Sequence, residues 1–88
     1  MSYSFRLSDR AKKDFVKLDK QTQRHIQKFI NEKIIAQSDP KTFAKPLVRN
    51  LKGLWKYRIG NYRIICNIDD DVFEILAVQI GHRRYIYE

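Results

Sequence analysis

Three cations and a basic, aromatic tail in the second half of the chain have the residue types that bind and cleave phosphodiesters. Lys56, Arg58 and Arg63 stand among aromatic and β-branched neighbours, and "GHRRYIYE" follows at residues 81–88. An arginine fork matches a pair of phosphate oxygens, and cations stabilise the extra negative charge of a phosphoryl-transfer transition state. These residue types indicate a site for a polyanion.

Metal-free cleavage of RNA is the chemistry that such residues could support. The ribose 2′-OH is an internal nucleophile already held near its phosphorus, so the protein need not activate a water. The protein must supply a base for that hydroxyl, an acid for the leaving 5′-oxygen, and cations around the phosphate. The candidate proton carriers are His82, Tyr85, Tyr87 and a lysine with a lowered pKa, and the residue types alone do not choose among them.

Metal-dependent hydrolysis finds no support in the basic region. Residues 41–68 contain no Asp or Glu, whereas a two-metal nuclease needs carboxylates to hold its ions. The chain also has no Gly-rich phosphate loop, no H-E-x-x-H motif and no paired-cysteine motif. We therefore expect no metal and no cofactor. The cations of this acid-free stretch are Lys41, Lys45, Arg49, Lys52, Lys56, Arg58 and Arg63.

The composition describes one basic, folded domain. The 88 residues carry a net charge of +8 and are 43% hydrophobic, which suits a single domain spanning residues 1–88 with a small core. Cys66 is the only cysteine and cannot form an internal disulfide, and neither a signal peptide nor a membrane-spanning apolar run is present. We expect a cytoplasmic protein with a polyanion-binding face and no membrane partner.

Hydrophobic periodicity predicts the elements that must position the site. Ser8 and Asp19 are candidate N-caps, and "SDP" at residues 38–40 ends the second helix. The segment 41–53 has no clear pattern. The elements predicted are strands at 2–8, 54–59, 62–68 and 72–80 and helices at 9–18 and 20–37. This order predicts an α+β fold: an N-terminal strand and an antiparallel helical hairpin packed on one face of a mainly antiparallel four-stranded sheet.

Side-chain alternation along the strands predicts which residues face the site. Trp55 and Tyr57 lie on one face of their strand, and Lys56 and Arg58 lie on the other. Arg63 can join these cations across the hairpin that turns at residues 60 and 61. If the helices cover the aromatic face, the open face is a cationic concavity suited to a phosphate backbone.

Two segments closely resemble a known family. "KGLWKYRIGNYRIICNIDDD" followed by "AVQIGHRRYIYE" resembles the C-terminal half of the RelE/ParE superfamily of bacterial toxins, in its RelE branch. The match covers about residues 44–88, and the N-terminal half is similar only in its layout of a strand and two helices. The resemblance implies a microbial-ribonuclease-like sandwich and a toxin of a type II toxin–antitoxin pair.

The resemblance also implies an activity and its partners. RelE-like toxins cleave mRNA in the ribosomal A site without a metal and so inhibit translation. A cognate antitoxin neutralises them, and the complex with the antitoxin binds operator DNA. By this resemblance Lys56 and Arg58 hold and polarise the scissile phosphate, while Arg63 and Arg83 stabilise transition-state charge. Tyr87 takes part in proton transfer or stacks on the substrate base.

Two positions depart from the family pattern. His82 stands where some members have a lysine, so His82 competes with Tyr87 and Lys56 as the general base. The spacing from the preceding glycine to Tyr87 is shorter than in some relatives, so Tyr85 competes as well. Further contacts to RNA are expected from Lys45, Arg49, Lys52, Arg84 and Tyr85.

Two other functions are compatible with the same fold. A ParE-like inhibitor of DNA gyrase would bind its target without chemistry of its own, and an inert module would bind only an antitoxin. Fold does not discriminate among these functions. The dense set of cations favours the nuclease.

Overall fold

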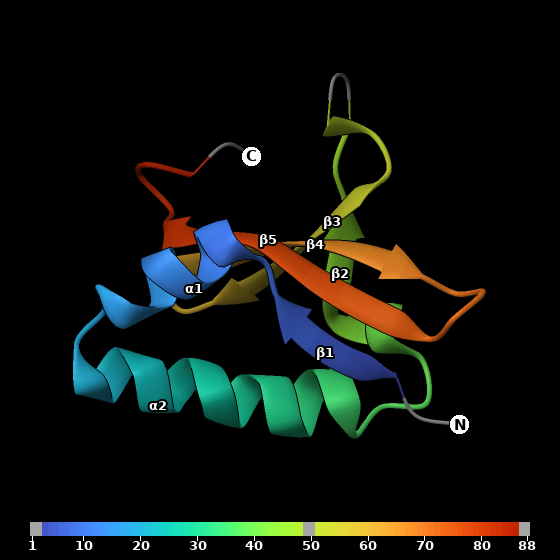
Figure 1. The fold of residues 1–88 in the computed structure, drawn as a ribbon, viewed down its shortest axis with the longest axis horizontal. Helices are drawn as coiled ribbons and strands as arrows, with labels where there is room; N and C mark the ends of the chain where they lie inside the picture. Colours follow the sequence, from blue (N-terminus) through green and yellow to red (C-terminus); the bar gives the residue numbers. More distant parts are fainter. Residues whose placement is uncertain (1–2, 49–50, 87–88) are drawn as a thin grey trace.

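Two helices pack on one face of a five-stranded sheet in the computed structural model, which describes residues 3–48 and 51–86 (Figure 1). The strand order is β1-β5-β4-β3-β2, with β1 parallel to β5 and the other neighbours antiparallel. The elements are β1 (Ser4–Leu7), α1 (Asp9–Val16), α2 (Lys20–Phe29), η1 (Ile30–Ile35), η2 (Pro40–Phe43), β2 (Ala44–Pro46), β3 (Leu54–Ile59), β4 (Tyr62–Asp69) and β5 (Glu74–His82). The predicted α+β class is confirmed.

The sheet has one more strand than the four predicted. The additional strand, β2, lies in the segment 41–53, which showed no clear pattern. The sequence did not predict it because three residues are too few to display alternation. It lies at the edge of the sheet, where Pro46 can be accommodated although it has no N–H to donate. The strand pairs Lys45 with Lys56 of β3, and so places a residue that was predicted to contact RNA beside the predicted phosphate ligands.

The helices begin where the capping residues predict. Ser8 is the N-cap of α1, and its hydroxyl accepts a hydrogen bond from the Ala11 N–H at 3.1 Å. The second helix was predicted as one α-helix over residues 20–37, but α2 ends at Phe29 and continues as the wider π-helical turn η1. Both parts contribute to the core, since Ile26 of α2 and Ile34 of η1 are fully buried.

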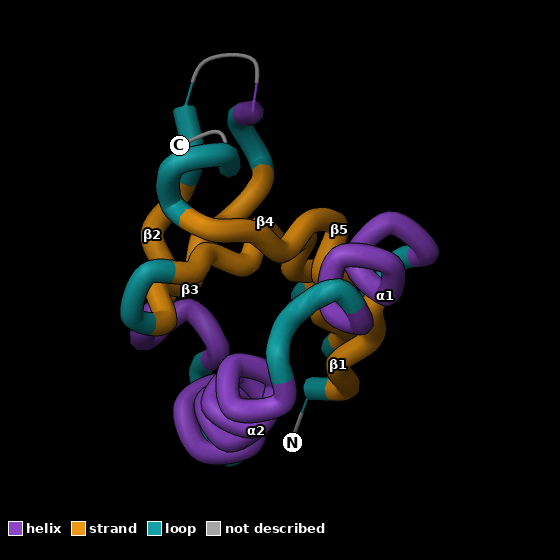
Figure 2. Tube along the Cα trace, turned by 90° about the vertical axis from the view of Figure 1, so that its left-hand side faces the viewer, coloured by secondary structure: helices purple, strands orange, loops and turns teal. Residues whose placement is uncertain are grey.

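The main core lies between the sheet and the helices. Figure 2 shows α2 running along one side of the sheet. Tyr57 and Ile59 of β3 are buried there, as their predicted face requires, and Trp55 of the same strand is half-buried. The fully or nearly buried members are Ala11, Ile26, Ile34, Tyr57, Ile59, Ile64, Cys66, Ile75, Ala77 and Ile80. Burial raises the pKa of the Cys66 thiol, so this cysteine is a core residue rather than a nucleophile.

A β-bulge interrupts the pairing of β4 with β5. Ile65 opposes Gln79 whereas Cys66 opposes Ala77, so Val78 is the extra residue on β5. Because side chains alternate with a period of two, one extra residue moves every later side chain to the opposite face. The bulge therefore decides to which face of the sheet the side chains at the end of β5 point.

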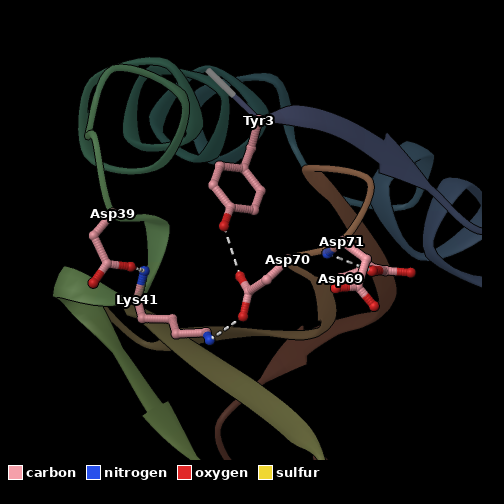
Figure 3. A network of polar contacts seen from close by, with 6 residues as sticks. All are labelled: Tyr3, Asp39, Lys41, Asp69, Asp70 and Asp71. Atoms are coloured by element: carbon pink, nitrogen blue, oxygen red, sulfur yellow. Dashed lines mark hydrogen bonds and ion pairs between the residues drawn. The ribbon is translucent and has the colours of Figure 1, made fainter. Parts of the chain in front are cut away.

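An exposed polar network joins three segments that are distant in sequence (Figure 3). The Tyr3 hydroxyl donates to Asp70 Oδ1 at 2.6 Å, and Lys41 Nζ donates to Asp70 Oδ2 at 2.6 Å. The Lys41 and Tyr3 hydrogen bonds hold the pKa of Asp70 below its usual range, and the same carboxylate raises the pKa of Tyr3 to about 12. Lys41 is thus engaged by the acidic turn.

No helix within residues 3–48 or 51–86 is long and apolar enough to cross a membrane.

Candidate functional site

Four cations from three adjacent strands line one hollow of about 170 Å³. Register explains why they meet. Lys45 of β2 is the direct partner of Lys56 on β3, and Arg58 of β3 is the direct partner of Arg63 on β4. Directly opposed residues of an antiparallel pair project to the same face, and Lys56 and Arg58 alternate with the buried Tyr57. The hollow therefore opens on the face away from the helices.

Arg63 is buried and is held by the backbone next to it. Its residue is only 6% exposed, and its Nη1 donates to the carbonyl oxygens of Gly60 at 3.0 Å and Tyr62 at 2.9 Å. These carbonyls belong to the β3–β4 turn, where Gly60 takes a φ of +57° that suits a residue without a side chain. The turn thus fixes one end of the guanidinium against the wall of the hollow.

The electrostatic character of the hollow is entirely positive. Its lining is Phe43, Lys45, Lys56, Arg58 and Arg63, which includes no carboxylate. Four cations close to one another repel, so a bound anion would relieve this repulsion. Among these side chains only Lys45 and Lys56 can give up a proton, because arginine stays protonated in proteins.

The remainder of the cationic face is apolar rather than open. A small cluster of Leu47, Ile65 and Ile86 is buried there, with Leu51, Leu54 and Val78 packed against it. Ile86 packs close to Gly81 of β5, since a Cβ at position 81 would lie in van der Waals contact with the Ile86 side chain at 3.7 Å. The predicted concavity is therefore confined to the end of the sheet near the β3–β4 turn.

His82 lies on the other face of the sheet from the four cations. It is the last residue of β5 and pairs with Tyr62, whose ring packs against the helix-side core. The two rings meet edge to face at 5.4 Å between centroids. The Arg84 N–H donates to His82 Nδ1 at 3.2 Å, so this ring nitrogen serves as an acceptor. The structure does not bring His82 together with Lys56, Arg58 and Arg63.

Arg83, Arg84 and Tyr85 are exposed and do not line the hollow. Arg83 is anchored by its backbone, since its N–H donates to the Asn61 carbonyl in the β3–β4 turn at 2.7 Å. Arg84 is exposed, and Tyr85 is 84% exposed with its ring centroid 6.1 Å from that of His82. This segment therefore runs beside the turn that ends the hollow.

Of the other predicted residues, one does not line the hollow and two fall outside the part of the chain that the structure describes. Lys52 is exposed between β2 and β3. Arg49 and Tyr87 fall outside the described residues. The roles predicted for these residues, and for those that line the hollow, stay predictions.

Phe43 lines the hollow although the sequence did not single it out. It is the last residue of η2, directly before β2, in the segment that carried no periodic pattern. An aromatic residue two positions before Lys45 in an acid-free stretch is the signal that could have found it.

Metal-ligand clusters do not form in the described part of the chain: no three His, Cys, Asp or Glu side chains there come together in a way that could hold an ion.

Comparisons with known proteins agree on one family. The family model described as "ParE toxin of type II toxin-antitoxin system, parDE" matches residues 5–87. Toxin RelG of Mycobacterium tuberculosis (strain ATCC 25618 / H37Rv) is 30% identical over 87 residues, which cover 99% of this chain and 98% of that protein.

Solved structures show the same fold. A chain of the toxin–antitoxin complex RelBE2 from Mycobacterium tuberculosis superposes with a TM-score of 0.86 at 28% identity, covering 94% of this chain and 100% of that one. A chain of the archaeal RelE–RelB complex from Pyrococcus horikoshii OT3 has a TM-score of 0.71 at 20% identity, covering 98% of this chain and 100% of that one, and shows the fold alone.

Proposed function

This chain belongs to the ParE toxin family of type II toxin–antitoxin systems, within the RelE/ParE superfamily, and we propose that it is a metal-independent endoribonuclease that cleaves mRNA in the ribosomal A site. Its effect on a cell is arrest of translation. A cognate antitoxin is its neutralising partner, as in the relatives whose structures are toxin–antitoxin complexes. The complex of the two proteins binds operator DNA.

The observation that carries this proposal is the convergence of Lys45, Lys56, Arg58 and Arg63 on one hollow without a carboxylate. Such a hollow suits the phosphate of an RNA strand. Three of these residues are the ones for which the family resemblance implies phosphate binding and charge stabilisation. The hollow is small and open, so it accommodates one phosphodiester of a flexible strand rather than a duplex.

The reaction proceeds by attack of the ribose 2′-oxygen on the adjacent phosphorus. The new O2′–P bond forms as the P–O5′ bond breaks, which leaves a 2′,3′-cyclic phosphate and a free 5′-hydroxyl. A base takes the proton of the 2′-hydroxyl, and an acid delivers a proton to the departing O5′. Lys56 and Arg58 hold the non-bridging oxygens, and Arg63 and Arg83 offset the charge that builds up on phosphorus substituents in the transition state.

Four residues are candidates for the base and the acid: Lys56, His82, Tyr85 and Tyr87. Lys56 lines the hollow itself, whereas His82 and Tyr85 do not. His82 would have to act from the opposite face, where its Nδ1 already accepts a hydrogen bond. Tyr85 is exposed with its ring near that of His82, and Tyr87 remains the tyrosine that the family pattern favours.

Mapping of mRNA ends after a short induction tests the proposal. We expect transcripts cut inside their reading frames as soon as growth stops, and the same cuts in a purified translation reaction containing ribosomes. Transcripts that remain intact at the moment of growth arrest would refute the nuclease.

Inhibition of DNA gyrase is the second candidate, and the family model favours it because that model describes ParE toxins. The same induction separates the two functions. A gyrase inhibitor induces the DNA-damage response and leaves mRNA intact, whereas an inert module changes neither.

A further inference from the structure

Phe43 presents an aromatic surface on the wall of the cationic hollow. The residue is 43% exposed, and its neighbours in the lining are Lys45, Lys56, Arg58 and Arg63. Other large apolar residues in the described ranges are also exposed, namely Val16, Val48, Val72, Phe73 and Tyr85, but none of them lines this hollow. Single exposed apolar residues are common on protein surfaces. The position of Phe43 among four cations is what sets it apart.

The backbone that carries Phe43 is held at several points. Pro40, the first residue of η2, is fully buried, and its carbonyl accepts the Tyr57 hydroxyl at 2.6 Å. Asp39 Oδ1 accepts the Lys41 N–H at 2.9 Å, and the Thr42 hydroxyl donates to the Asp39 carbonyl at 2.8 Å. The last residue of η2 is therefore presented by a fixed turn and not by a loose loop.

A cation from the helical layer also positions the ring. Lys33 Nζ of η1 lies 5.1 Å from the centroid of the Phe43 ring, within the range of a cation–π interaction. This contact ties the ring to the helical layer, although Lys33 itself does not line the hollow. A strand that enters the hollow thus meets four cations and one aromatic ring.

An aromatic ring beside a groove of cations is the combination that binds single-stranded nucleic acid. The cations neutralise the phosphates, and the ring accepts the flat face of a base. A β3–β4 site with cations alone would bind any polyanion, whereas a stacking surface adds affinity only for a strand that has bases. Phe43 therefore supplies a recognition element that the four cations lack.

We propose that Phe43 stacks on a base of the RNA strand whose phosphate occupies the hollow, and that Lys33 positions the Phe43 ring for this contact. The proposal rests on the proposed function, because it assumes that the occupant of the hollow is single-stranded RNA. It assigns Phe43 to substrate binding and not to bond cleavage.

The test compares a short labelled RNA with a strand of the same length in which stable abasic spacers replace the nucleosides. Fluorescence anisotropy at low salt gives the affinity of the wild-type protein and of each variant for both strands. We expect wild type to prefer the strand with bases, and Phe43→Ala to lose about 5- to 100-fold in affinity for that strand, the range of one base stack. The affinity of Phe43→Ala for the abasic strand should stay at the wild-type value.

Three further variants complete the comparison. Phe43→Trp should keep the preference for bases, which separates loss of stacking from loss of fold. Arg58→Ala should lower the affinity for both strands by the same factor, because it removes only a phosphate contact. Val16→Ala removes another exposed apolar side chain, on α1 and outside the hollow, and should change neither affinity.

Two results would overturn the inference. One is a wild-type protein that does not distinguish the two strands. The other is a Phe43→Ala protein that keeps the full preference for bases. With either result, the proposed nuclease function still holds if the wild-type protein cuts mRNA on ribosomes. Failure of this inference is therefore distinguishable from failure of the proposed function.

Discussion

Arg58 and Arg63 are directly paired across the β3–β4 hairpin, and both side chains line the same hollow. Like charges that face each other across a strand pair lower stability. Two turn carbonyls that accept from Arg63 Nη1 offset part of this repulsion. This pairing of like charges opposes folding and yet lines a cationic hollow, which is the kind of compromise that binding sites show.

Arg58→Ala is expected to separate stability from activity. Removing one of two opposed cations should leave the thermal midpoint unchanged or slightly higher. The rate of mRNA cleavage on ribosomes should fall by about 10²–10³, the usual cost of losing one preorganised transition-state contact. Thermal melts and single-turnover cleavage assays measure the two effects. Arg24→Ala, which removes an exposed arginine of α2 outside the hollow, is the matched control, and equal losses from both variants would contradict the assignment.

Lys56→Arg tests whether Lys56 moves a proton or only holds the phosphate. Arginine keeps the positive charge but does not release a proton, so a proton-transfer role predicts a rate loss of about 10² or more. The pH–rate profile should also lose one limb. Lys45→Arg, on the strand paired with β3, is the comparison and should lower the cleavage rate less than Lys56→Arg does. A wild-type rate for Lys56→Arg would restrict Lys56 to phosphate binding.

His82→Gln is expected to keep most of the cleavage activity. His82 pairs with Tyr62 on the helix side of the sheet, away from Arg63, and its Nδ1 is occupied by the Arg84 N–H. The substitution should lower the thermal midpoint, because it removes the ring that packs edge to face on Tyr62. A rate loss as large as that of Arg58→Ala, in a protein that remains folded, would instead make His82 a proton carrier.

Tyr57→Phe should destabilise the fold by about 1–3 kcal/mol, since it leaves the buried Pro40 carbonyl without its hydrogen bond. Burial of the hydroxyl raises the pKa of Tyr57, in keeping with a group that is neutral in the folded state. Because the same bond holds η2 in place, the variant should also reduce affinity for RNA through Phe43. Chemical denaturation measures the first effect and anisotropy the second. Unchanged stability would show that the bond contributes nothing net.

The network around Asp70 predicts a loss of stability in acid. The pKa of Asp70 is lowered in the folded state, so the carboxylate stabilises the fold at pH values above its unfolded pKa of about 3.9, and this contribution disappears as the pH falls through the lower folded value. The raised pKa of Tyr3 works in the other direction: its contribution is complete below pH 10 and is lost as the pH rises through about 12.

Asp70→Asn should therefore lower the thermal midpoint at neutral pH and flatten its dependence on pH below 4. Asp71→Asn in the same turn is the control, because in Figure 3 the Asp71 carboxylate points away from Tyr3 and Lys41. Identical pH curves for Asp70→Asn and wild type would rule out the network as the source of the acid sensitivity.

Local patterns predicted most of the fold. Alternation in "LWKYRI" placed Tyr57 on the core face and Lys56 and Arg58 on the other, because a strand that is buried on one side must alternate. The predicted strand at 54–59 agrees residue for residue with β3, and the Ser8 cap begins α1 as expected. The π-helical end of the second helix was missed, since apolar spacing does not distinguish it from an α-helix.

The sequence by itself determined that three cations share one face, because Lys56, Arg58 and Arg63 lie within a single hairpin whose register follows from its turn. Only the tertiary structure decided what surrounds them. The short edge strand β2 brought in Lys45 and Phe43 through pairing with β3, a contact that leaves no periodic trace in so few residues.

The bulge at Val78 moved His82 to the face away from the cations, whereas pairing of β2 with β3 brought Lys45 toward them. Unbroken alternation along β5 would place His82 on the face opposite Ala77, which is the face of Arg63. One extra residue in β5 moves it to the face of Tyr62 instead. That choice depends on how two strands distant in the chain align with each other, and such alignment is a property of the packed sheet.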